Sequence, residues 1–318
     1  MECPRMTDYR PAWIDPLILN PNITDICING EKAIYIDQGM GLEPLNPSSS
    51  PAYSESEIKK WIIHELSLMG KTWDAKHPFI DGTLSSGHRI HVAFPPLSQQ
   101  GILVSLRRLS SVQTREIATS RWQDSPLYEK LQSIVLSGDS LLIAGATGSG
   151  KTTLLSDLLG IIPPHERIIA LEDTPEIIPQ HPHFISLVSR PANADGYGEV
   201  TLRMLLKQTL RMRPDRILLG ECRGSEVLEL LQALNTGHKG AMATLHANSP
   251  RDALRRIELL CLLSAGSSLS SSCIRELISL GIQWVAQVER TGPYRRVSEL
   301  YRVEGREGDT ILMRPMIK

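Results

Sequence analysis

Residues 141–153 read LLIAGATGSGKTT, and no other stretch of the 318-residue chain restricts its folding so strongly. Five apolar residues, LLIAG, lead into a segment that fits the pattern G-x-x-x-x-G-K-[ST] without a mismatch and continues as the helical sequence TTLLSDLL. In this pattern a buried strand ends in a tight glycine-rich loop that opens directly into a helix. The segment therefore predicts a strand–loop–helix unit of the kind on which α/β proteins are built.

Further apolar runs of strand length, separated by helical stretches, support this fold class. The candidates are the strands 141–145, 167–171, 216–220 and 241–245 and the helical stretches 201–213 and 225–234. Strands that alternate with helices predict a mainly parallel sheet covered on both faces. Two later runs, 282–288 and 294–303, are expected as strands at the far edge of the sheet. The polar stretch 264–272 is expected to form a flexible loop.

The first third of the chain has a different pattern, with short β-like runs and one helix. Ser54 and Glu57 form a capping box, apolar residues recur behind them at helical spacing, and Gly70 supplies a stop. The strand-like runs are 25–30, 32–37, 87–96 and 101–109. We therefore predict a small α+β domain over residues 1–109, a polar linker over 110–124 and an α/β domain over 125–318.

Composition excludes several classes of protein. The 34 basic and 35 acidic side chains are balanced and the sequence pI is about 6.8, so we expect no nucleic-acid partner. The five cysteines are scattered without a C-x-x-C pair, which indicates neither a disulfide framework nor a zinc site. The N-terminus does not resemble a secretory signal, and no window reaches the ~18–20 apolar residues of a membrane span. We expect a cytoplasmic protein whose membrane association is peripheral.

The glycine-rich loop carries the chemistry of nucleotide binding. Its glycines let backbone N–H groups wrap phosphate oxygens, the helix N-terminus adds its dipole, Lys151 reaches the β- and γ-phosphates, and Thr152 can ligate Mg²⁺. We predict that ATP and Mg²⁺ are bound through Gly145, Thr147, Gly148, Ser149, Gly150, Lys151, Thr152 and Thr153. The alternative is a glycine-rich turn that binds nothing, but such a turn needs no Lys-Thr pair.

Acidic residues follow two of the predicted strands, at the edge of an α/β sheet where ligands bind. Glu172 and Asp173 come after 167–171, and Glu221 comes after 216–220. Hydrolysis needs one carboxylate to orient or deprotonate water and another to hold the Mg²⁺ shell. Each acid could instead be a helix N-cap or a surface ion pair.

Histidines and arginines complete the set of candidates. His238 and His246 bracket the strand 241–245, where a neutral imidazole could sense the γ-phosphate, although a lone histidine is more often structural. Arginine grips phosphate oxygens with a planar fork, and the candidates are Arg89, Arg107, Arg108, Arg211, Arg213 and Arg216. Each could also belong to a solvated face or a salt bridge, and we favour such a structural role for Arg108.

Four ordered motifs resemble one family: the phosphate loop, ALEDTPEI, LRMRPDRILLGECRG and TGHKGAMATLHANSPRDAL. They are similar to the aspartate box, Walker B strand and histidine box of the type II/IV secretion traffic ATPase superfamily. The segments DICINGEKAIYID and PFIDGTLSSGHRIHVAFPP resemble the N-terminal domain of that superfamily. The stretch RPANADGYGEVTLRMLLKQTLRMRPDRILLGE is closest to the tight-adherence (Flp-type) pilus branch. The tetracysteine zinc element of the type II secretion branch is absent from the sequence.

The resemblance implies a RecA-like motor domain preceded by an N-terminal domain, assembled as a homo-hexamer at the inner membrane. It assigns the water-activating role to Glu172 and the Walker B role near the metal to Glu221. It places His246 in the histidine box and sends Arg89 and Arg107 to the phosphates. The expected partner is the inner-membrane platform of a pilus or secretion system.

The function that these features predict is ATP hydrolysis that drives pilus assembly or protein secretion. Conjugation and type IV secretion ATPases are near relatives and remain alternatives. A DNA-translocating ATPase is a rival that needs a basic groove. A second rival is a regulatory module that hydrolyses nucleotide slowly or not at all.

Overall fold

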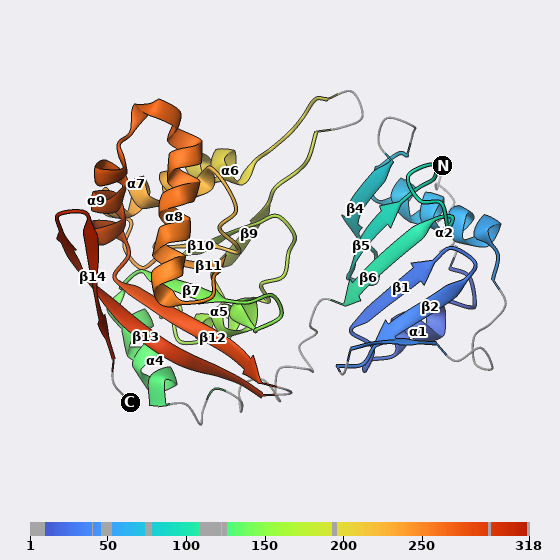
Figure 1. Cartoon of the computed structure of the whole chain (residues 1–318), viewed down its shortest axis with the longest axis horizontal. Helices are drawn as coiled ribbons and strands as arrows, with labels where there is room; N and C mark the ends of the chain where they lie inside the picture. The colour runs from blue at the N-terminus through green and yellow to red at the C-terminus, as the bar shows by residue number, and fades with distance from the viewer. Residues whose placement is uncertain are drawn as a thin grey trace. The chain divides into compact units, whose positions relative to one another are not determined.

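The structure is a computed structural model that describes residues 10–39, 41–45, 53–73, 78–108, 122, 126–192, 196–291 and 294–316. These residues form two compact units, one within residues 10–108 and one mainly within residues 122–316 (Figure 1), and each is described by itself. The predicted linker at 110–124 lies outside the described residues except for Trp122. The domain boundaries at residues 109 and 125 therefore stay predictions.

The N-terminal unit is an antiparallel sheet in the order β3-β2-β1-β6-β5-β4, packed against two helices. Its elements are α1 (Asp15–Leu19), β1 (Asp25–Asn29), β2 (Ala33–Asp37), β3 (Leu42–Pro44), α2 (Glu55–Leu68), β4 (Phe79–Thr83), β5 (His88–Ala93) and β6 (Leu103–Arg108). The predicted capping box is confirmed, because Ser54 accepts from Glu57 N and the Glu57 carboxylate accepts from Ser54 N. Apolar side chains alternate along the strands and pack on Trp61, so one sheet face forms the core and the other carries polar residues.

The C-terminal unit is built on an eight-stranded sheet in the order β14-β13-β12-β7-β11-β10-β8-β9. The strands from β12 to β9 run parallel, and β13 and β14 are antiparallel. Its elements are α4 (Pro126–Ser137), β7 (Leu141–Gly145), α5 (Lys151–Leu159), β8 (Ile168–Glu172), β9 (Phe184–Val188), α6 (Leu202–Thr209), β10 (Arg216–Leu219), α7 (Glu226–Asn235), β11 (Met242–His246), α8 (Pro250–Ala265), η2 (Gly266–Ser268), α9 (Ser271–Gly281), β12 (Trp284–Thr291), β13 (Tyr294–Glu307) and β14 (Thr310–Pro315).

Helices cover both faces of this sheet, which confirms the predicted α/β architecture. Helices α6 to α9 pack with one face in a core that includes Leu206, Leu231 and Ile257. Helices α4 and α5 pack with the other face in a core that includes Leu131 and Leu155. Every side chain of β7 and β8 is buried because both faces are covered, which explains why these strands are apolar except for Glu172 at the end of β8.

The register of the central strands brings functional residues to one edge. Gly145, the last residue of β7, lies opposite His246 on β11 and opposite Val288 on β12. Leu219 on β10 lies opposite Leu171 on β8, so the residues that follow these two strands reach the same edge. The carboxyl ends of all these strands therefore surround the glycine-rich loop.

Two expectations about the sheet and loops need correction. The run 282–288 was expected at the far edge, but β12 lies beside β7 in the middle of the sheet and is parallel to it. The chain returns there through α8 and α9, so strands that come late in the sequence do not have to extend the edge. The predicted flexible loop 264–272 consists mostly of the end of α8, η2 and the start of α9, where Ser270 caps the N–H of Cys273.

None of the helices in the described part of the chain combines the length and apolar character that a membrane span requires.

Candidate nucleotide site

The glycine-rich loop joins β7 to α5 in a conformation that only glycine fits at key positions. Gly148 and Gly150 have φ angles of 71° and 103°, in the left-handed region that side chains disfavour. A Cβ on Gly145 would lie 2.5 Å from the carbonyl oxygen of Val288 and 2.6 Å from Oγ of Ser149. The Ser149 hydroxyl is buried and has no hydrogen-bond partner among the described residues. A cradle of this shape with an unsatisfied hydroxyl fits a phosphate group.

Lys151 begins α5 and its side chain reaches back across the loop, with only 6% of its surface exposed. Its Nζ donates to the carbonyls of Gly145 (3.1 Å) and Ala146 (2.9 Å) and lies 3.2 Å from Nδ1 of His246. Burial lowers the pKa of Lys151 to about 8, and the negative charges of Glu221 and Glu176 oppose this shift. The ammonium group is therefore held inside the loop without a full counter-charge.

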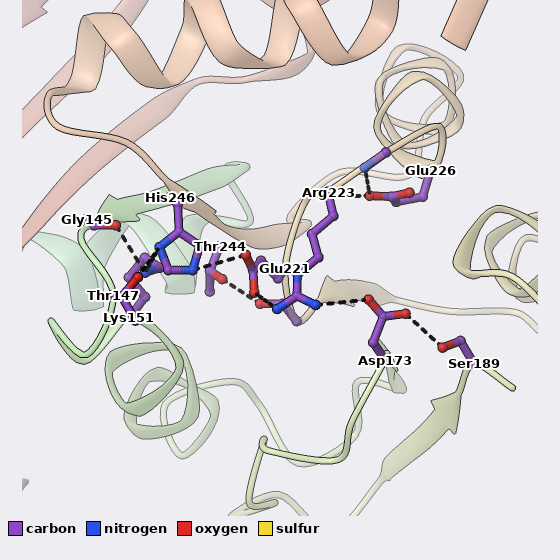
Figure 2. Close-up of polar contacts among 12 residues, drawn as sticks. Gly145, Thr147, Lys151, Asp173, Ser189, Glu221, Arg223, Glu226, Thr244 and His246 are labelled. Carbon is purple, nitrogen blue, oxygen red and sulfur yellow. Dashed lines mark hydrogen bonds and ion pairs between the residues drawn. The ribbon is translucent and has the colours of Figure 1, made fainter. Parts of the chain in front are cut away.

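A chain of polar contacts runs from Lys151 along the carboxyl edge of the sheet (Figure 2). Nε2 of His246 lies 3.1 Å from one oxygen of Glu221, and the other oxygen accepts a 2.6 Å hydrogen bond from Arg223. The Arg223 guanidinium is 3.8 Å from Asp173, which accepts a 2.7 Å hydrogen bond from Ser189. This chain of polar contacts links the ends of β7, β11, β10, β8 and β9.

His246 holds a defined protonation state within this chain. Burial lowers the pKa of His246 below its usual value, the charge of Lys151 adds to the shift, and Glu221 opposes it. The imidazole is therefore neutral at neutral pH, with Nδ1 accepting from Lys151 and Nε2–H donating to Glu221. In this tautomer His246 connects the lysine of the loop to the carboxylate that follows β10.

Glu172 ends β8 but takes no part in the polar contacts between Lys151 and Ser189. Its carboxylate is 2% exposed and accepts from the backbone N–H groups of Glu176 (2.8 Å) and Ile177 (2.7 Å) and from the hydroxyl of Ser186 (3.2 Å). Burial raises the pKa of Glu172, while these three hydrogen bonds oppose the rise. One oxygen of Glu172 thus binds the turn that follows β8, and the other binds Ser186 on the neighbouring strand β9.

Three residues near the loop were not singled out from the sequence. The charge of Glu176, in the motif ALEDTPEI, opposes the lowering of the Lys151 pKa by burial, and it adds to the rise in the Arg223 pKa that the hydrogen bond to Glu221 mainly causes. Arg223 lies two residues beyond Glu221, and Arg295 of β13 contacts the loop at Gly150. Glu176 and Arg223 could have been found from the sequence, because they lie in the motifs ALEDTPEI and LRMRPDRILLGECRG. Arg295 gave no such signal, because its strand was expected far from the loop.

The other candidate residues of the phosphate loop lie near Lys151 and His246. Thr152 and Thr153 lie half-buried in the first turn of α5, where their position suits contact with a ligand at the helix N-terminus. The hydroxyl of Thr147 is 3.5 Å from Nδ1 of His246. Beside the loop opens a pocket of about 560 Å³, whose wall includes buried Gln287. Oε1 of Gln287 has no hydrogen-bond partner within the described structure.

Other candidates lie away from the loop. Arg216 is buried at the amino end of β10, opposite to the loop, and its Nε lies 2.5 Å from Glu166 in an ion pair. Arg211 and Arg213 precede β10 at the same end, and His238 precedes β11 there. Parallel strands carry only the residues after them to the ligand edge, whereas Arg216 begins its strand and the other three residues come before a strand.

The arginines of the N-terminal unit have different environments. Arg89 and Arg107 are cross-strand partners on β5 and β6, and Nε of Arg107 is 3.7 Å from Asp25. Arg108 donates hydrogen bonds to the backbone carbonyl of Ile18 in α1 and to those of Asn20 and Ile23 after it. These bonds give Arg108 a structural role, although its partners are backbone carbonyls and not the expected solvent or salt bridge.

The order of the motifs and the geometry of the loop can now be compared with known proteins. The sequence profile of the family described as Type II/IV secretion system protein matches residues 12–284. The chain belongs to this family. The match covers both the phosphate loop and the chain of contacts from Lys151 to Asp173.

Several relatives align with almost the whole chain. A Mycobacterium tuberculosis protein whose name suggests a role in conjugal transfer is 36% identical over 306 residues, which are 92% of this chain and 85% of that protein. The conjugal transfer protein TrbB of Rhizobium radiobacter is 32% identical, over 89% of this chain and 84% of its own. The type IV secretion system protein PtlH of Bordetella pertussis is 30% identical, over 94% and 95%.

Solved structures share the fold of this chain. The ATPase DotB of Yersinia pseudotuberculosis aligns with a TM-score of 0.63 at 18% identity, over 91% of this chain and 78% of that chain. The pilus retraction motor PilT, solved with bound ADP, aligns with a TM-score of 0.59 at 19% identity, over 89% and 79%. The RecA-like fold with a preceding smaller domain is thus confirmed, whereas no comparison singles out the tight-adherence branch.

Proposed function

We propose that this protein hydrolyses ATP to ADP and phosphate and uses the energy as the motor of a secretion or pilus machine. The observation that carries the proposal is the contact chain from Lys151 through His246 to Glu221, which starts inside the phosphate loop. A loop that only bound nucleotide would not need a neutral histidine connecting its lysine to a carboxylate. Membership of the family supports the same reaction.

The site residues have distinct roles in this proposal. The backbone of the loop would wrap the phosphates, and Lys151 would move its ammonium from the carbonyls of Gly145 and Ala146 onto the β- and γ-phosphates. Thr152 and Glu221 would hold Mg²⁺ and its water shell. The bound ion would neutralise charge on the phosphates. His246 would then sense the γ-phosphate, because its Nδ1 loses the hydrogen bond from Lys151 when that lysine moves.

Glu172 is the proposed water-activating base. Its raised pKa suits a group that takes a proton near neutral pH, but one of its oxygens is bonded to the turn after β8 and the other to Ser186 on β9. In this proposal nucleotide binding rearranges that turn and frees one oxygen. Glu221 and Glu176 are the alternative bases at this edge.

Matched glutamine variants test the reaction and the base together. Glu172→Gln, Glu176→Gln and Glu221→Gln would be compared for Mg-ATP affinity and for phosphate release. The base is the residue whose variant binds ATP like wild type but loses turnover. Wild-type protein without measurable turnover would contradict the motor and support the slow regulatory module. Normal turnover in Glu172→Gln would move the base to another acid.

The proposed assembly is a homo-hexamer at the cytoplasmic face of the inner membrane, with a platform protein as its partner. Arg89 and Arg107 lie side by side on one strand pair, and two like charges in this position favour an anionic ligand. Mixing an Arg89→Ala, Arg107→Ala double variant into wild type should poison turnover if the sites act as a ring. Electron microscopy with a non-hydrolysable ATP analogue should show rings, and stable monomers would argue against them.

The type of machine is proposed from two kinds of similarity. The sequence motifs favour the tight-adherence pilus branch, whereas the named relatives belong to conjugal transfer and type IV secretion. A conjugation role would also be compatible with DNA translocation. The balanced charge disfavours direct DNA binding, so we expect no salt-sensitive stimulation of ATPase activity by DNA. Such stimulation would support the translocase instead.

A further inference from the structure

Arg295 of β13 lies directly on the phosphate loop. A Cβ built on Gly150 would be 2.7 Å from Cδ of Arg295, 3.2 Å from its Nε and 3.6 Å from its Cζ. The end of this side chain, including the guanidinium carbon, therefore packs against the residue that immediately precedes Lys151. Gly150 is also the N-cap residue of α5, so Arg295 lies at the positive end of that helix.

The fold brings Arg295 to this place through the β12–β13 hairpin. Strand β12 runs parallel to β7, with Val288 opposite Gly145, and continues three residues beyond it to Thr291. Strand β13 then returns antiparallel, with Arg295 opposite Arg290. Side chains alternate along a strand, so Arg295 shares a face with Val297, which is buried in the core that contains α5. Arg295 thus points to the face of the sheet on which α5 begins.

Its neighbour Arg296 has the opposite orientation and a different role. Arg296 is exposed and forms a 3.2 Å ion pair with Glu289 across the hairpin. The two consecutive arginines therefore differ in position but hardly in chemistry. This makes Arg296 a matched control for Arg295.

Several positively charged groups lie near Gly150. Arg295 adds a guanidinium to the ammonium of Lys151 and the N-terminus of α5, and Arg290 stands opposite Arg295 on β12. Like charges directly opposite each other on a sheet are destabilising, and so are cations at a helix N-terminus. A phosphate bound at the loop would relieve both effects.

We propose that Arg295 binds the α- and β-phosphates of the nucleotide and connects the β12–β13 hairpin to nucleotide binding. The proposal rests on the proposed function, because it assumes that the loop binds ATP. Loops of this pattern hold the α- and β-phosphates with their backbone N–H groups, and Gly150 belongs to that part of the loop. The planar fork of arginine can grip two phosphate oxygens at once, which a lysine cannot do. ADP carries the same phosphates, so Arg295 contributes to ATP and ADP binding alike.

The experiment compares Arg295→Ala with Arg296→Ala in the full-length protein. Isothermal titration with Mg-ADP and with a non-hydrolysable ATP analogue should show about 10- to 100-fold weaker binding of both ligands to Arg295→Ala. Arg296→Ala should stay within about twofold of wild type because a rim ion pair contributes little. Arg295→Lys should lie between the two, since it keeps the charge but loses the fork. In turnover, Arg295→Ala should raise KM more than it lowers kcat.

Equal ADP affinity in Arg295→Ala and Arg296→Ala would overturn the proposal. Thermal melting of each variant without ligand checks the fold, and Arg295→Gln replaces Arg295→Ala if the alanine variant does not melt cooperatively. Lys151→Ala distinguishes a failure of the proposed function from a failure of the role proposed for Arg295. If wild type binds no nucleotide, the proposed function fails. Only the role of Arg295 fails if wild type and Arg295→Ala bind nucleotide equally well and Lys151→Ala does not bind it.

Discussion

Replacing Lys151 by methionine should make the nucleotide-free protein more stable while it abolishes ATP binding. Burial lowers the pKa of Lys151 from 10.5 to about 8, and each unit corresponds to ~1.4 kcal/mol. Keeping this lysine charged therefore costs the folded state about 3 kcal/mol at pH 7. Methionine has a similar length and no charge, but it leaves two carbonyls of the loop without a donor, whereas His246 is partly exposed and can accept from water instead. Subtracting about 1–2 kcal/mol for these lost bonds leaves a net gain of about 1–2 kcal/mol.

Urea unfolding of both proteins without nucleotide measures this gain. The folded pKa of Lys151 lies below the unfolded value, so the unfolded chain holds the proton more tightly. The cost is therefore fully present below pH 8 and disappears as the pH rises from about 8 to 10.5. The advantage of Lys151→Met should shrink across the same range. With Mg-ATP at 100 times its Kd, wild type alone should gain ~2.7 kcal/mol.

Exposed Lys130 on α4 supplies the control, because Lys130→Met removes a lysine of the same unit without relieving burial. Its stability should change by less than ~0.5 kcal/mol. The reasoning about a buried charge would be refuted if Lys151→Met were less stable than wild type at pH 7. It would also be refuted if the difference between the two proteins did not depend on pH.

Three further predictions concern single contacts. Gly145→Ala should lose nucleotide binding and melt at a lower temperature, because its Cβ would lie 2.5 Å from a backbone oxygen; normal ADP titration would contradict this. Arg223→Ala should lower kcat by about tenfold or more, with stability changed by less than about 1 kcal/mol since its ion pairs are partly exposed; recovery in Arg223→Lys would support a positioning role. Arg216→Ala should destabilise the protein by ~3 kcal/mol in urea by leaving Glu166 without its buried partner, and unchanged stability would show that water compensates the pair.

The elements around the phosphate loop were predictable because local pattern and tertiary environment agree there. Strand β7 matches the predicted range 141–145, and the helix after the loop begins at Lys151. The loop conformation requires glycine at Gly148 and Gly150, so the glycine pattern of the sequence directly indicates the loop. Strand β9 was missed because its side chains are only partly buried at the edge of the sheet, and their pattern is weak.

Predictions about side chains were less successful where the orientation depends on tertiary contacts. Glu172 comes at the expected end of β8, but its carboxylate is bonded inside the following turn. Arg216 fits an arginine motif, yet it lies at the amino end of β10 because the motif precedes the strand. Sequence order gives the end of the strand but not the direction in which a side chain points.

Two arginines illustrate how the site depends on the whole sheet. Arg223 follows β10 and connects Glu221 to Asp173, whereas Arg295 reaches the loop from β13, about 150 residues after the loop in the sequence. Strand β10 borders β11, and β13 is separated from β7 by β12, so the two arginines approach the loop from opposite sides of the β7–β11 pair. A phosphate that draws Lys151 away from His246 would weaken the bond that orients Glu221, while binding to Arg295 would fix the hairpin. One ligand would therefore change the β10 side and the β12–β13 side of the sheet together. The proposed mechanical ATPase requires such a concerted change.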